Sequence, residues 1–154
     1  MSEKGAKLLV RQIAAIVIAF IILWVVSRVL VIEEVVLREP VQVRVVDLAK
    51  LLMALIVAGL IKGLGGPLSE IYHEAAPSKA EAISGVTDNI LNIVALAILY
   101  MFLRELAVAV LQLFLPARTA NVAYDLVFII AGLLIVYSIV KAATTPSPSY
   151  KKPY

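Results

Sequence analysis

The chain has 154 residues, of which 62% are hydrophobic and only 16% are charged, with 14 lysines and arginines against 11 aspartates and glutamates. Soluble domains carry about 45–50% apolar and about 25% charged residues, so the composition excludes an ordinary soluble globular protein and indicates a membrane protein. The chain has no cysteine, which excludes disulfides and thiolate metal sites, and its single histidine, His73, excludes any site that needs two.

The first long apolar run predicts a membrane-spanning helix over about residues 8–36. Its charged residues, Arg28, Glu33 and Glu34, lie only in its last third. A helix needs about 20 apolar residues to span a bilayer, so this run is long enough to span and must tilt or protrude. The run is also too long for the apolar segment of a signal peptide.

A second helix is predicted over about residues 45–62, with Asp47 in its first turn. The connector before it contains Pro40 and is short, so the two helices are expected to be antiparallel neighbours. A carboxylate near a helix N-terminus compensates the helix dipole, and we interpret Asp47 in this way. Residues 1–64 are therefore expected to form a first transmembrane hairpin.

The following segment, residues 65–82, is predicted to be a connector on the cytoplasmic side. Gly65, Gly66 and Pro67 are poor helix formers and are expected to end the second helix. Residues 68–74 have the pattern of a short amphipathic turn at the membrane interface.

Residues 83–143 are predicted to form a second transmembrane hairpin. Its helices are expected over about 83–115 and 121–142, joined by a short loop that contains Pro116. Asp125 lies in the first turn of the last predicted helix, and we interpret it as a second helix N-terminal carboxylate.

Lysine and arginine are unevenly distributed between the two predicted sides of the membrane. One side holds most lysines and includes a flexible basic tail predicted over residues 144–154, whereas the other side holds arginines only. Cytoplasmic flanks carry the excess of these residues, so both termini are predicted to be cytoplasmic. The first set is Lys4, Lys7, Arg11, Lys62, Lys79, Lys141, Lys151 and Lys152, and the second is Arg38, Arg44 and Arg118.

The two predicted hairpins show the same landmarks in the same order, which indicates an internal repeat. Each copy has two spans, so both copies insert in the same direction and are parallel repeats about an axis along the membrane normal. The predicted fold is all-α, an integral membrane four-helix bundle made of two tandem parallel-repeat helical hairpins. The aligned pairs are Trp24 with Tyr100, Arg28 with Arg104, Pro40 with Pro116 and, after a slightly longer loop, Asp47 with Asp125.

Each hairpin carries an aromatic residue and an arginine on one face of its first helix, because the two are one turn apart. The structural interpretation is that Trp24 and Tyr100 are interfacial anchors, with each arginine extending outward to the headgroups. The functional interpretation is a cationic ring at the mouth of an anion-selective pore, formed by Arg28 and Arg104. Ionisable residues within a span usually face a partner, so Glu105 is expected to pair with Arg28 between helices. A proton or ion relay is the alternative.

Enzymatic chemistry is not expected, because no catalytic, cofactor-binding or metal-binding motif is present. A solute transporter usually has broken helices and central polar groups, whereas the predicted spans look intact.

The expected function is therefore that of a non-catalytic subunit or assembly element of a larger membrane complex or filament. A homo-oligomeric channel or pore is the alternative. The expected partners are the lipid bilayer and either further copies of the chain or other membrane subunits, and not nucleic acid.

Overall fold

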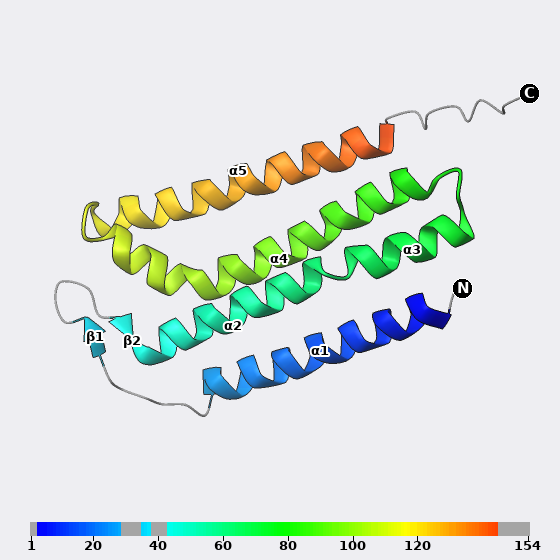
Figure 1. Cartoon of the computed structure of the whole chain (residues 1–154). Coiled ribbons are helices and arrows are strands. Elements are labelled where there is room, and N and C mark those ends of the chain that lie inside the picture. Colours follow the sequence, from blue (N-terminus) through cyan, green and yellow to red (C-terminus); the bar gives the residue numbers. More distant parts are fainter. Residues whose placement is uncertain (1–2, 29–34, 38–42, 145–154) are drawn as a thin grey trace, which may run out of the picture.

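The computed structural model describes residues 3–28, 35–37 and 43–144. These residues form five α-helices and one antiparallel pair of very short strands, and this pair lies between the first two helices (Figure 1). The elements are α1 (Glu3–Arg28), β1 (Val35–Leu37), β2 (Val43–Arg44), α2 (Val45–Lys62), α3 (Gly65–Ala75), α4 (Ala80–Leu111) and α5 (Ala117–Thr144).

Four helical stretches in the described part of the chain are long and apolar enough to cross a membrane. Each exceeds the roughly 20 residues that a span requires, which confirms the prediction of four spans. One of these stretches consists of α2 and α3 together. The stretches are Gly5–Val26, Val46–Ala75, Ala80–Leu111 and Ala117–Thr144.

The helices lie side by side in a row, in the order α1, α2 with α3, α4 and α5 (Figure 1). Extensive contacts join each helix to its neighbour in this row, and α3 contacts both α1 and α4. Among the described residues, no comparable contact joins α1 to α5. The predicted four-helix bundle arrangement is therefore not confirmed, because the two outer helices, α1 and α5, make no extensive contact.

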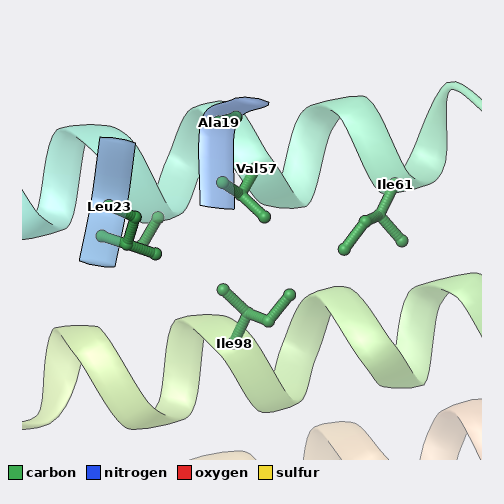
Figure 2. Close-up of a cluster of buried hydrophobic side chains, with 6 residues drawn as sticks. Ala19, Leu23, Val57, Ile61 and Ile98 are labelled. Carbon is green, nitrogen blue, oxygen red and sulfur yellow. The ribbon is translucent and has the colours of Figure 1, made fainter. Parts of the chain in front are cut away.

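The main core lies where α1, α2 and α4 meet. Ala19 of α1 and Ala54 of α2 are buried there, and these small residues let the helix backbones approach closely. Figure 2 shows Ile98 of α4 pointing toward Val57 and Ile61 of α2. Because lipid tails are as apolar as these side chains, close packing rather than removal from water stabilises this contact.

A second cluster joins α4 to α5. Its buried members are Val108 of α4 with Ala120 and Tyr124 of α5, and larger aromatic and aliphatic side chains pack around them. The helix α5 has no extensive contact with any other element in the described residues. None of the residues in its most apolar stretch is buried.

The helix bounds differ from the predicted ones at three places. The first helix is described up to Arg28, and Val35–Leu37, which was predicted to be helical, forms a strand that pairs with Val43–Arg44. The third predicted helix covers Ala80–Leu111 instead of 83–115. The last helix begins at Ala117 instead of 121, and the carbonyl of the preceding proline accepts the bond that starts its first turn.

The predicted connector over residues 65–82 is mostly helical, because the chain resumes a helix directly after the break that ends α2. The N–H of Leu64 donates to the carbonyl of Ile61 at 3.1 Å, which tightens the last turn of α2. The helix then restarts at Gly65, and Pro67 occupies its first turn, where a proline needs no hydrogen-bond partner. The stretch Val46–Ala75 is thus helical on both sides of one break, which follows Lys62.

Candidate functional site

Polar side chains of α4 and α5 contact one another near the end of the row that carries β1 and β2. The Nε atom of Arg104 lies 3.7 Å from Oδ1 of Asp125, and Arg104 Nη2 donates to Oδ1 of Asn121 at 3.0 Å. The Tyr100 hydroxyl donates to Oδ1 of Asp125 at 2.9 Å. One carboxylate is therefore held by a cation and a hydroxyl from the neighbouring helix.

Aromatic rings hold this polar network in place from one side. Tyr124 is 4% exposed, and its ring lies 5.5 Å from that of Tyr100 in a stacked arrangement. Phe128 completes the group, with its ring centre 4.8 Å from that of Tyr124. The Tyr124 hydroxyl donates to the backbone carbonyl of Tyr100 at 2.8 Å, so the hydroxyl of this buried ring is paired.

A second group of charges lies between α2 and α4. The ammonium of Lys50 is 3.9 Å from Asp47 Oδ1, one turn away, and 3.8 Å from Glu105 Oε2 on α4. The Lys50 and Asp47 side chains are 24% and 16% exposed, whereas the Glu105 side chain is 73% exposed. Glu105 therefore points away from the helix row, with Lys50 at its inner side.

The two predicted anchors occupy different environments. Trp24 is 63% exposed on α1, as expected for a ring that faces lipid. Tyr100 instead packs against other rings and donates to Asp125, so it belongs to the polar network. The side chain of Arg28 lies outside the described residues, so its pairing with Glu105 stays a prediction, and the described neighbour of Glu105 is Lys50.

The two carboxylates predicted to lie at helix N-termini also differ. Asp47 lies in the first turn of α2, as predicted. The prediction for Asp125 is wrong, because α5 begins at Ala117 and its first turn holds no acidic residue. Asp125 lies about two turns further along, where its carboxylate contacts α4 rather than the end of its own helix.

A polar cavity of about 500 Å³ lies between α4 and the break that separates α2 from α3. It is lined by two glycines and by five polar side chains. Within the described residues, none of these five side chains has a hydrogen-bond or ion-pair partner. The lining residues are Lys62, Gly65, Gly66, Ser69, Ser84, Asp88 and Asn92.

Two glycines near this cavity lie directly against side chains of other helices. A Cβ atom at Gly65 would collide with the carboxylate of Asp88, and one at Gly63 would collide with the side-chain amide of Gln12. That amide donates to the carbonyl of Leu60 at 2.9 Å, in the last turn of α2. The break thus brings α1 and α4 close to the backbone of the second span, and it leaves peptide groups next to polar side chains.

An apolar groove of about 420 Å³ lies between α4 and α5, next to the polar network. Its walls are mostly aliphatic, and Tyr100 and Asp125 lie at one end. The described residues hold no group of three histidine, cysteine, aspartate or glutamate side chains arranged to bind a metal ion.

Sequence reasoning missed the cavity, although a signal was present. Ser84, Asp88 and Asn92 recur at intervals of four, which places them in one polar stripe along a helix. The predicted second helix, 45–62, matches α2, and the break follows directly after Lys62. Asn121 and Tyr124, which complete the other polar network, had no role in the prediction.

No protein family, curated protein or solved structure matches the chain. Its class is indicated by the fold alone. Four helical stretches long and apolar enough to span a bilayer, joined by short connectors, are the pattern of a multi-pass α-helical membrane protein.

Proposed function

We propose that the protein is a non-catalytic subunit or assembly element of a larger membrane structure. The observation that carries this proposal is the outward-facing carboxylate of Glu105, on a row of helices that does not close on itself. Ionisable groups inside a membrane almost always face protein or water, because exposure to lipid is costly. Another chain or a water path is therefore needed to cover this side of α4.

The depth of Glu105 follows from distances along α5. Arg118 and Lys141 lie about 35 Å apart at 1.5 Å per residue, which matches a hydrocarbon core of about 30 Å between two interfaces. Asp125 is then about 10 Å inward from Arg118. Because Arg104 contacts Asp125, its neighbour Glu105 lies at the same depth, below the headgroups.

The first test is the mass of the protein after gentle extraction from its own membrane. We expect an assembly larger than one chain, either with further copies or with other membrane subunits. Replacing Glu105 by leucine should change that assembly, and the matched variant Glu81→Leu, at the other end of α4, should not. An isolated monomer, with both variants behaving alike, would contradict the proposal.

A homo-oligomeric channel is a second candidate, supported by the charges that gather at one depth. Lys50, Glu105, Arg104 and Asp125 come from three neighbouring helices, and such side chains can line a water path between copies. Arg104→Gln should then lower anion conductance in liposomes, whereas Lys79→Gln should not. Liposomes that stay electrically silent at all voltages and tensions would exclude this function.

We further propose that both termini face the cytoplasm, based on the asymmetry of lysine and arginine. The chain has no native cysteine, so single introduced cysteines report their own side of the membrane. A membrane-impermeant thiol reagent added to intact cells should label Arg118→Cys and leave Thr144→Cys unlabelled. The reverse pattern would invert the proposed topology.

A further inference from the structure

The cavity at the break between α2 and α3 is lined by one positively and one negatively charged side chain. Lys62 ends α2 and Asp88 lies on α4, and both line the cavity. Neither has an ion-pair partner in the described part of the chain. Polar groups that are organised by a fold and left unpaired are typical of a ligand site, and about 500 Å³ falls within the usual size of such sites.

The remaining lining adds hydrogen-bonding groups of both kinds. Ser69 and Ser84 carry hydroxyls that donate and accept, and Asn92 carries an amide that does the same. They lie on two sides of the cavity, one on α3 and two on α4. A ligand that carries both an anion and a hydrogen-bond-donating cation satisfies this set better than a simple ion does.

The cavity lies at the depth of one membrane interface. A Cβ atom at Gly85, next to the lining residue Ser84, would be 3.4 Å from the Cβ of Ala142. Ala142 follows Lys141, and Lys62 itself lines the cavity. Lysines at the ends of spans reach toward the headgroups, so the cavity is at headgroup depth and the apolar helices continue from it into the bilayer.

We propose that this cavity binds a phosphoester that carries a primary ammonium, which at this depth is the headgroup of an amino-phospholipid. Lys62 faces the phosphodiester, and Asp88 faces the ammonium, as charge-assisted hydrogen bonds require. A primary ammonium offers three N–H donors, whereas a quaternary ammonium offers none. The cavity should therefore distinguish phosphatidylethanolamine from phosphatidylcholine, although both headgroups have no net charge.

The test is native mass spectrometry of the protein with an equal mixture of these two lipids, carrying identical acyl chains. We expect roughly tenfold preferential retention of phosphatidylethanolamine, the size of effect that one hydrogen bond between charged groups produces. Asp88→Asn should reduce the preference to nearly none, and Asp88→Glu should keep part of it. Lys62→Gln should weaken retention of both lipids, because both contain the phosphate.

Matched controls remove charges from the same end of the molecule without touching the cavity. Lys79→Gln and Glu81→Gln change exposed side chains and should leave the preference unaltered. Free O-phosphoethanolamine tests the source of the ligand. Without acyl chains it should fail to displace the lipid at about millimolar concentration, and displacement would support the same headgroup chemistry with a soluble source.

Equal retention of the two lipids by the wild-type protein would overturn the proposal. A preference that survives in Asp88→Asn would also overturn it, because the ammonium would then be recognised elsewhere. If Asp88→Asn does not fold, the comparison of Lys62→Gln with Lys79→Gln decides the matter, since equal retention by these two would remove the phosphate site. The same spectra report the number of chains in the assembly, so failure of this proposal is separate from failure of the proposed assembly function.

Discussion

The two interfaces of this helix row, here called the aliphatic seam (α1, α2 and α4) and the aromatic seam (α4 and α5), are held by different kinds of contact. Where α1, α2 and α4 meet, small and aliphatic side chains such as Ala54 and Val57 pack without any buried polar group. Between α4 and α5, stacked tyrosines and an Arg104–Asp125 contact join the helices. Lipid offers no hydrophobic driving force between helices, so close packing and interhelical hydrogen bonds are the two available ways to hold them. Close packing dominates where α1, α2 and α4 meet, and contacts that include interhelical hydrogen bonds dominate between α4 and α5.

Removal of a ring from the aromatic seam should have the largest effect. Tyr124→Ala loses two ring contacts and one hydrogen bond, and we expect it to lower the free energy of unfolding by about 2–3 kcal/mol. The measurement is unfolding in mixed detergent micelles, followed by circular dichroism. Tyr137→Ala on the same helix is the control, because Tyr137 is exposed. Equal losses in the two variants would show that the ring contacts of Tyr124 contribute nothing to the free energy of unfolding beyond those of an exposed tyrosine.

Overpacking of the aliphatic seam should have the next largest effect. Ala54 is completely buried, so Ala54→Leu must push α2 away from its neighbours, at a cost of about 1–3 kcal/mol. Gly59→Leu is the matched control, because a side chain at Gly59 would meet open space. The same detergent titration measures both. A neutral effect of Ala54→Leu would show that the helices do not pack closely at this seam.

A smaller change separates the two contributions within the aromatic seam. Tyr124→Phe keeps the ring and removes only the bond to the Tyr100 carbonyl. Hydrogen bonds between membrane helices average about 0.6 kcal/mol, so we expect a loss of that size in the same unfolding experiment. A loss as large as that of Tyr124→Ala would mean that the hydroxyl, rather than ring packing, holds α5 to α4.

The smallest expected effect concerns the charged contact of Lys50 on α2 with Glu105 on α4. Lys50 and Glu105 are 3.8 Å apart, and Glu105 is largely exposed. Exposed ion pairs couple by about 0.2–1 kcal/mol, so a double-mutant cycle with Lys50→Ala and Glu105→Ala should give a coupling at the low end of that range in detergent. A stronger coupling would place this charge pair among the forces that hold the aliphatic seam together.

The existence of the spans could be predicted from composition, but their arrangement could not. Apolar runs of sufficient length indicate membrane helices wherever their side chains point. The same uniformity hides which face meets a neighbour, because a helix that is apolar all round carries no periodic signal. An open row and a closed bundle are therefore compatible with one sequence, and the internal repeat inferred from Trp24, Tyr100 and the paired prolines stays a prediction.

The candidate sites were predicted unevenly for local reasons. Asp47 was placed correctly because α2 begins close to the predicted position. Asp125 was misplaced because the chain resumes a helix at once after Pro116, which moved the helix start by about one turn. Tyr100 was recognised only as an anchor, since its partners Tyr124 and Asp125 belong to another helix. The cavity was missed because glycines and a proline were taken to end the helix, whereas the chain restarts it.

The linear order of the row has a consequence for how the protein is made. Every extensive contact joins helices that follow one another closely in the sequence, so each helix meets its partner as soon as it has been synthesised. Local contacts of this kind favour fast folding, because little chain entropy is lost in forming them. Insertion can therefore proceed in chain order, and α5, which is made after the other described helices, docks onto a row that α1 to α4 have already formed.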